Sequence, residues 1–176
     1  MNPGEPQQGE QCLWADTSRC IGCFSCAVAC KMEHDLPAGP RPLMAIQIGP
    51  LEHEGALIMH FQPAACLHCA SPACVEACPT GAMHKRADGL VLSDPDLCIG
   101  CQTCAIACPF GVPQLNPGTG KICKCDGCAA RVDQGLTPAC VLTCPTEALS
   151  FMSPGLKAQR AREQFSRGIH QPRSKR

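Results

Sequence analysis

Cysteine is the residue type in this sequence with the clearest capacity for chemistry. The chain of 176 residues contains 18 cysteines, and 16 of them fall into four groups of four. In chain order the groups are Cys20, Cys23, Cys26 and Cys30; Cys66, Cys69, Cys74 and Cys78; Cys98, Cys101, Cys104 and Cys108; and Cys125, Cys128, Cys140 and Cys144. Each group ends in a Cys-x3-Cys step, and three are closed by a proline. Four sets of soft thiolate ligands predict four metal centres.

The spacing within the groups indicates which metal is bound. A structural zinc site is normally built from two separated Cys-x2-Cys pairs around one small ion. Residues 98–109 instead read Cys-x2-Cys-x2-Cys-x3-Cys-Pro. This is the bacterial ferredoxin pattern for a [4Fe–4S] cluster, in which the fourth cysteine ligates a neighbouring cluster. Four [4Fe–4S] clusters are therefore predicted, with a zinc-binding interaction module and a disulfide framework as the alternatives.

The lengths of the linkers predict which groups form a unit. Nineteen residues separate Cys78 from Cys98, whereas 35 separate Cys30 from Cys66. The second and third groups are therefore expected to form one two-cluster unit, and the first and fourth groups the other. A Cys-x3-Cys step spans about one helical turn, so a single short helix can hold ligands of two neighbouring clusters.

This nested order defines four sites, each numbered after the group that supplies three of its ligands. The first site is Cys20, Cys23, Cys26 and Cys144; the second is Cys66, Cys69, Cys74 and Cys108; the third is Cys98, Cys101, Cys104 and Cys78; the fourth is Cys125, Cys128, Cys140 and Cys30. Cys12 and Cys123 remain outside these sites. Cys123 competes with Cys125 for the fourth group, but only Cys125 continues the Cys-x2-Cys spacing of the other groups.

The elements that position these ligands are expected to be short. Aromatic residues are scarce, with five Phe, one Trp and no Tyr, so clusters rather than large side chains are expected to organise the core. Apolar runs at 44–49, 55–61 and 89–94 predict brief strands, and no long element is expected before the C-terminal tail. Trp14 is expected to pack over the first cluster, with an anchor for a partner as the alternative.

Other residues offer little chemistry of their own. His68, inside "CLHC", is predicted to hydrogen-bond near a cluster rather than to replace a cysteine ligand. Because no phosphate loop, catalytic triad or carboxylate pair stands out, a non-catalytic subunit is predicted. No run approaches 18 apolar residues, and the first thirty residues lack a signal-peptide pattern. The expectation is a cytoplasmic protein with no membrane span.

Four segments carry a resemblance to a known family: "SRCIGCFSCAVACK", "CLHCASPACVEACPTGA", "CIGCQTCAIACPFG" and "KCDGCAARVDQGLTPACVLTCPTEAL". From about Trp14 to Phe151 the chain resembles four-cluster ferredoxin subunits of the dimethyl-sulfoxide-reductase type. Such subunits also serve formate dehydrogenases, tungsten aldehyde oxidoreductases and some hydrogenases. The resemblance implies an α+β fold with two pseudo-symmetric bacterial-ferredoxin-like halves, a role as an electron wire and a larger catalytic partner. It also supports the nested ligand assignment.

The expected organisation is a four-cluster ferredoxin domain at 12–152 and a basic tail at 153–176. Within the domain, one half is 60–112 and the other combines 12–35 with 120–152. The predicted partner is a molybdenum or tungsten pterin oxidoreductase, such as an aldehyde oxidoreductase or formate dehydrogenase. A hydrogenase or carbon-monoxide dehydrogenase partner and a free-standing polyferredoxin are the alternatives. A flavoprotein and a second copy of the chain are further candidate partners, and nucleic acid is not expected.

The tail differs in charge from the rest of the chain. From residue 156 onward it has seven lysines and arginines against the single acid Glu163, whereas the whole chain has no net charge. The remainder is therefore acidic by six charges. Ser153 and Pro154 predict the start of a helix. The tail is expected to dock on an acidic surface of the catalytic partner or of another copy, with a solvated tail as the alternative.

Overall fold

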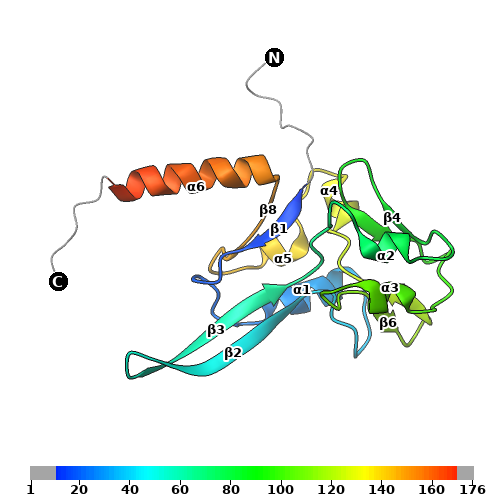
Figure 1. Cartoon of the computed structure of the whole chain (residues 1–176), viewed down its shortest axis with the longest axis horizontal. Coiled ribbons are helices and arrows are strands. Elements are labelled where there is room, and N and C mark those ends of the chain that lie inside the picture. Colours follow the sequence, from blue (N-terminus) through cyan, green and yellow to red (C-terminus); the bar gives the residue numbers. More distant parts are fainter. Residues whose placement is uncertain (1–10, 170–176) are drawn as a thin grey trace, which may run out of the picture.

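A computed structural model describes residues 11–169, and in it the first and last strands pair with each other (Figure 1). Strand β1 (Cys12–Ala15) runs antiparallel to β8 (Leu149–Met152), with Trp14 opposite Ser150. This pairing closes the chain on itself, because it joins segments separated by more than 130 positions. It brings the first and fourth cysteine groups to the same end of one small sheet, because Ala15 lies opposite Leu149.

Four short helices hold the third cysteine of each group. They are α1 (Ser25–Glu33), α2 (Ala73–Glu76), α3 (Thr103–Ala107) and α5 (Ala139–Leu142), and the fourth cysteine lies in α1 or just after the other three helices. Helix α1 packs against α5, and α2 packs against α3. The residues that precede α1 and α3 have left-handed backbones, and those that precede α2 and α5 are prolines. These sharp turns point the third cysteine of every group into the interior, where all four are buried.

Two small hairpins and one helical turn complete the interior. Strand β4 (Met83–Lys85) pairs with β5 (Val91–Ser93), β6 (Gln114–Asn116) pairs with β7 (Lys121–Cys123), and α4 (Ala129–Val132) follows the start of the fourth group. The strand predicted at 89–94 is confirmed as β5. Two-stranded hairpins are barely stable alone, so they depend on what they pack against.

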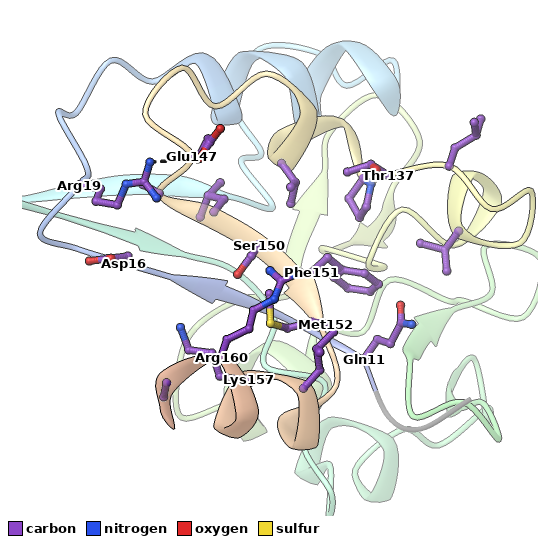
Figure 2. Close-up of a pocket in the computed structure, with 18 of the residues that line it drawn as sticks. Gln11, Asp16, Arg19, Thr137, Glu147, Ser150, Phe151, Met152, Lys157 and Arg160 are labelled. Atoms are coloured by element: carbon purple, nitrogen blue, oxygen red, sulfur yellow. Dashed lines mark hydrogen bonds and ion pairs between the residues drawn. The ribbon is translucent and has the colours of Figure 1, made fainter. Parts of the chain in front are cut away.

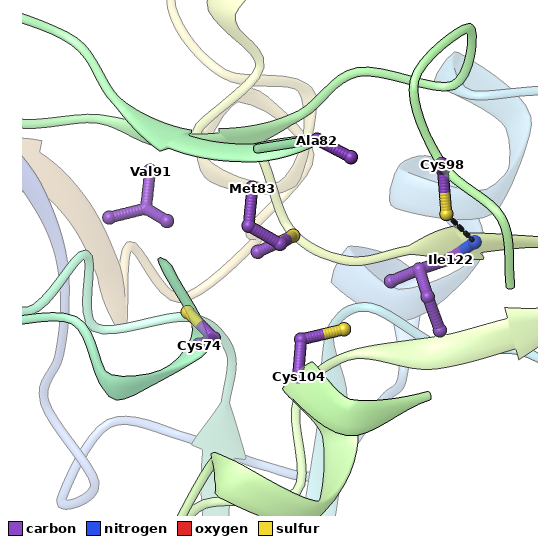
Figure 3. Packing of buried hydrophobic residues seen from close by; sticks show 7 residues of the cluster. All are labelled: Cys74, Ala82, Met83, Val91, Cys98, Cys104 and Ile122. Atoms are coloured by element: carbon purple, nitrogen blue, oxygen red, sulfur yellow. Dashed lines mark hydrogen bonds between the residues drawn. The ribbon is translucent and has the colours of Figure 1, made fainter. Parts of the chain in front are cut away.

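The core beneath these hairpins is partly made of predicted ligands. Figure 3 shows one cluster of buried residues: Cys74, Ala82, Met83, Val91, Cys98, Cys104 and Ile122. Three of the seven are cysteines, and the aliphatic side chains between them come from β4, β5 and β7. A core this poor in large side chains buries little apolar area, so whatever the thiols bind adds directly to its stability.

The longest strands form a hairpin that projects from the body (Figure 1). Strands β2 (Met44–His53) and β3 (Ala56–Ala64) confirm the strands predicted at 44–49 and 55–61 but extend beyond them. The expectation that no long element precedes the tail was therefore wrong. A register shift between Ile48 and Leu51 accommodates the intervening Gly-Pro, and such a bulge lets a strand continue past a proline. The hairpin contacts the first cysteine group, because a Cβ at Gly22 would overlap the Phe61 ring.

The C-terminal helix α6 (Pro154–Ile169) extends away from the rest of the molecule (Figure 1). Its predicted start is confirmed, and Ser153 Oγ accepts a hydrogen bond from the Leu156 backbone N–H at 3.4 Å. The Trp14 indole donates to the Met152 carbonyl at 3.1 Å, and Lys157 Nζ lies 5.6 Å from the centre of its ring. Trp14 was expected over the first cluster, but it instead anchors this helix through a cation–π contact. Among residues 11–169, no helix has the length and apolar character needed to cross a bilayer.

Candidate metal centres

Three interior cavities are each lined by one predicted ligand set. One cavity is lined by all four cysteines of the third site, another by all four of the first site, and another by all four of the fourth site. In each case the fourth cysteine comes from a different group from the other three, as the nested order requires. Three cavities with the same four-cysteine lining fit one repeated cofactor.

The cysteines of the second site also lie together. Burial raises the pKa of Cys66, and the neighbouring Cys69 and Cys108 thiols raise it further. Burial likewise raises the pKa of Cys74, with Cys66 and Cys108 again as neighbours. Cys66 shares an apolar cluster with Val112, against which Cys108 packs. The structure thus brings together the four thiols assigned to the second site.

The protonation of the thiols shows what kind of ligand these sites require. Burial raises the pKa of Cys30 to about 12 and that of Cys125 to about 11, and in both cases a neighbouring thiol adds to the effect. Four buried thiolates cannot share a small cavity unless a cationic centre balances their charge. The iron of a cluster supplies such a centre and keeps its thiol ligands deprotonated. The donor set therefore fits iron–sulfur clusters.

Backbone N–H groups and threonine hydroxyls lie next to two of the crossing ligands. The Ala148 N–H donates to Cys144 Sγ at 3.2 Å, and the Met83 N–H donates to Cys78 Sγ at 3.4 Å. The hydroxyls of Thr146 and Thr80 lie 3.8 and 3.6 Å from the same sulfurs. Donors of this kind favour a thiolate over a thiol. Sequence reasoning missed these threonines, although the repeated Cys-Pro-Thr at 78–80 and 144–146 was a usable signal.

Lys124 places a buried positive charge between two sites. Within residues 11–169 the buried polar or charged side chains are those of Lys124 and His68, which are 6% and 7% exposed. The Lys124 ammonium donates to the backbone carbonyls of Val91 and Cys125, and it lies 3.9 Å from Cys66 Sγ. It therefore stands between a ligand of the second site and a ligand of the fourth. A buried ammonium is costly unless negative charge lies nearby, and two anionic clusters would provide that charge.

His68 lies beside the second site without occupying a ligand position. Its Nδ1 accepts a hydrogen bond from the Val91 N–H at 2.9 Å, and its own backbone N–H donates to Cys66 Sγ at 3.4 Å. Burial, followed by the Lys124 charge, lowers the pKa of His68 to about 4, so the ring is neutral. The His68 side chain thus binds the Val91 N–H, while Lys124 binds the Val91 carbonyl. This arrangement agrees with a hydrogen-bonding role and leaves ligation to cysteine.

His34 reaches the rim of the fourth site. Its Nε2 lies 3.3 Å from Asp126 Oδ1 and 3.9 Å from Cys128 Sγ. Three potential metal ligands therefore lie close together. Because Cys128 also lines the cavity of the fourth site, this group is part of that site rather than a separate ion site.

The two cysteines outside the groups lie apart from the cavities. Cys12 is in β1 with its Sγ 3.9 Å from the Met152 carbonyl, and Cys123 is a half-buried residue of β7. Neither lines the cavities of the first, third or fourth sites. Replacing either one by serine is therefore expected to leave the iron content per chain unchanged, as measured by anaerobic iron analysis. Loss of one cluster in the Cys123→Ser variant would show that the fourth group is misassigned.

A groove on the surface of the described residues has no cysteine in its lining. It has a volume of about 580 Å³ and lies between α6 and β8, and Figure 2 shows the side chains along it. Three basic residues line it, Arg19, Lys157 and Arg160, and Arg19 is paired with Glu147 at 3.2 Å. Nothing in this lining suits redox chemistry. The groove is better suited to contact with another molecule than to a cofactor.

Comparison with known proteins agrees with the iron–sulfur chemistry of the cavities. Two models of a 4Fe-4S dicluster domain match residues 19–82 and 57–153. The probable anaerobic dimethyl sulfoxide reductase subunit YnfG of Escherichia coli is 44% identical over 148 residues, covering 79% of this chain and 71% of that protein. The B subunit of the anaerobic dimethyl sulfoxide reductase of the same species is 43% identical over 146 residues, with the same coverage.

A third relative extends the comparison to another reductase. The thiosulfate reductase electron transfer subunit PhsB of Salmonella typhi is 46% identical over 139 residues, covering 77% of this chain and 72% of that protein. The longer dicluster match alone spans more than half of the present chain. Together with the thiol-lined cavities, these similarities show that the chain belongs to the 4Fe-4S dicluster family, as a ferredoxin-like electron-transfer subunit of the dimethyl sulfoxide reductase type.

Proposed function

We propose that the chain carries four [4Fe–4S] clusters and passes single electrons to or from the catalytic subunit of a molybdenum or tungsten pterin oxidoreductase. The observation that carries this proposal is the gathering of sixteen cysteines into four separate sets, each drawn from two groups. The relatives named as dimethyl sulfoxide and thiosulfate reductase subunits favour a reductase partner. No comparable observation favours a hydrogenase or carbon-monoxide dehydrogenase.

The chain's part in electron transfer is to hold the clusters close together at a fixed spacing. Helix α1 offers Cys26 to the first site and Cys30 to the fourth, and both side chains are buried. The Cys-x3-Cys steps that begin in α2, α3 and α5 likewise offer one ligand to each of two sites. A [4Fe–4S] cluster supplies a centre that accepts and releases one electron, at a potential set by burial and hydrogen bonding. Rigid sharing of one helix by two sites keeps the spacing constant in both oxidation states.

The packing supports a particular order of the four sites. The first and fourth sites share α1 and α5, and the second and third share α2 and α3. The two pairs meet where Cys66 of the second site and Cys125 of the fourth lie in one apolar cluster. We therefore place the sites in the order first, fourth, second, third. Electrons would enter or leave at the first and third sites, which lie at the two ends.

This order corresponds to the nested halves expected from the sequence. The pairing of β1 with β8 supports the combination of 12–35 with 120–152, and the packing of α2 on α3 supports the half at 60–112. The tail at 153–176 is proposed to dock on the catalytic partner, since α6 projects from the body (Figure 1). The cytoplasmic location stays a prediction.

Metal analysis tests the proposed cluster content. Because sixteen cysteines supply four ligands to each of four sites, anaerobically purified chain is expected to contain about 16 iron and about 16 acid-labile sulfide. Zinc should be present only in traces, which the same samples report by elemental analysis. Stoichiometric zinc, or half the expected iron after reconstitution, would contradict the four-cluster assignment.

A further inference from the structure

One polar atom in the interior of this protein is left without a partner. Among the buried side-chain nitrogen and oxygen atoms of residues 11–169, only His68 Nε2 makes no hydrogen bond. The other ring nitrogen is occupied, because His68 Nδ1 accepts the Val91 N–H at 2.9 Å. A nitrogen that accepts cannot carry the ring proton, so the proton of the neutral imidazole is on Nε2. An unsatisfied buried N–H is destabilising, so the atom is expected to have a partner in the loaded protein.

The unpaired nitrogen faces a site to which its own loop does not belong. His68 lies in the loop between Cys66 and Cys69, which are ligands of the second site. Its side chain nevertheless lines the cavity formed by the four cysteines of the fourth site. Nε2 also lies close to the loop that begins the fourth group, since a Cβ at Gly127 would be 3.5 Å from it. The ring therefore crosses the boundary between the two pairs of sites.

We propose that the His68 Nε2–H donates a hydrogen bond to a sulfur atom of the cluster held at the fourth site. This inference rests on the proposed four-cluster ligation and adds a residue that tunes one particular cluster. Hydrogen bonds to cluster sulfurs are among the factors that set reduction potential. The reduced cluster is the more negative form, so a donor stabilises it more than the oxidised form. His68 therefore raises the potential of the fourth-site cluster.

The position of this hydrogen bond gives it a role in the electron path. The second and fourth sites meet at the junction between the two pairs, where Lys124 contacts Cys66 Sγ on the side of the second site. His68 and Lys124 hold the same backbone unit, Val91, by its N–H and its carbonyl. One buried donor thus faces each of the two clusters at the junction. These residues therefore affect the electron transfer between the second and the fourth site.

Two substitutions of His68 test the roles of its two ring nitrogens separately. In His68→Asn the amide oxygen reaches about as far as Nδ1, so it can accept the Val91 N–H, but the donor at the position of Nε2 is lost. Asparagine also tolerates the left-handed backbone of this position, where φ is 46°. In His68→Gln the amide reaches as far as Nε2 and can restore a donor there. Asparagine is thus expected to remove the effect and glutamine to retain most of it.

The expected result concerns one cluster out of four. In an anaerobic redox titration followed by electron paramagnetic resonance, His68→Asn should lower the potential of the fourth-site cluster and leave the other three unchanged. We expect about a tenfold fall in its reduced-to-oxidised ratio at a fixed potential, which is about 59 mV for a one-electron couple. The fourth-site signal is identified by its alteration in Cys128→Ser. His84→Asn, at an exposed histidine, is the matched control and should change no potential.

A second measurement tests the contact itself in the unaltered sequence. In protein labelled with ¹⁵N-histidine, electron–nuclear double resonance on the fourth-site signal should detect a histidine nitrogen and a proton that exchanges in D₂O. His34 is the competing source, because its Nε2 lies 3.9 Å from Cys128 Sγ. The couplings assigned to His68 should persist in His34→Asn and disappear in His68→Asn.

The outcomes distinguish this inference from the proposed function. Failure to find about 16 iron in the unaltered chain would contradict the four-cluster function itself. With full iron, an unchanged fourth-site potential in His68→Asn would overturn the hydrogen bond, as would couplings that vanish only in His34→Asn. A shift confined to the second-site cluster would also overturn it, because His68 would then act only through Cys66. A fourth-site shift in His68→Asn that His68→Gln largely reverses would support it.

Discussion

Replacing Cys78 by serine is expected to disrupt the cluster at the third site and to spare the one at the second. Cys78 belongs by sequence to the second group, yet its side chain lines the cavity of Cys98, Cys101 and Cys104. Its thiol is also one of the neighbours that raise the pKa of Cys104, after burial. Removing a thiolate ligand should eliminate that cluster or convert it to a form with fewer irons, a loss of about one to four iron per chain. Iron analysis and paramagnetic resonance measure both effects.

The matched control lies one helical turn away in the same segment. Cys74 is buried beside Cys66 and Cys108, so Cys74→Ser should disrupt the second site and spare the third. The two variants together test the crossing of ligands between groups. If Cys78→Ser altered the second-site signal and Cys74→Ser the third, the crossed assignment would be wrong. Cys30→Ser and Cys144→Ser form the equivalent pair for the fourth and first sites.

Removal of residues 156–176 is expected to weaken the complex with the catalytic partner while all iron is retained. The segment carries a net positive charge of six, and the side chains of Arg160 and Arg162 are exposed. None of the ion pairs within residues 11–169 involves either arginine. Each exposed pair with a partner carboxylate contributes about 0.2–1 kcal/mol, so several should give roughly a tenfold change in affinity. Binding measurements at two salt concentrations check this result, and the loss should be larger at low salt.

A milder variant separates charge from helix loss. Arg160→Gln with Arg162→Gln keeps α6 and its contact between Lys157 and Trp14, so it should reproduce much of the weakening. Arg41→Gln, at an exposed arginine outside the tail, serves as the control. The groove beneath α6, lined by Arg19, Lys157 and Arg160, is the surface on which we expect an acidic segment of the partner (Figure 2). Unchanged affinity in both tail variants would show a solvated tail, whereas concentration-dependent self-association lost on deletion would indicate a second copy.

The metal chemistry could be predicted from the sequence because iron–sulfur ligation is mostly local. Three ligands of the first and third sites lie within seven residues, so spacing alone identifies the cofactor. Even the crossing of ligands, such as Cys78 toward the third site, follows from the ferredoxin pattern together with the length of the linkers. The structure brings these same sets together without testing metal binding. The start of α6 could be predicted for the same reason, since Ser153 and Pro154 begin the helix through interactions within its first turn.

Features that depend on contacts between distant segments were decided only by the tertiary structure. The length of the β2–β3 hairpin depends on a bulge that absorbs a proline, and Trp14 packs on α6 because β1 pairs with β8. The junction between the two pairs of sites joins His68, Val91 and Lys124. The pattern "CLHC" singled out His68, but no local pattern placed it on the same backbone unit as Lys124. Burial gives these groups their roles, because a histidine or lysine takes on a defined electrostatic function only where water is excluded. Spacing along the chain specifies ligands, whereas the order and tuning of the sites arise from which loops pack together.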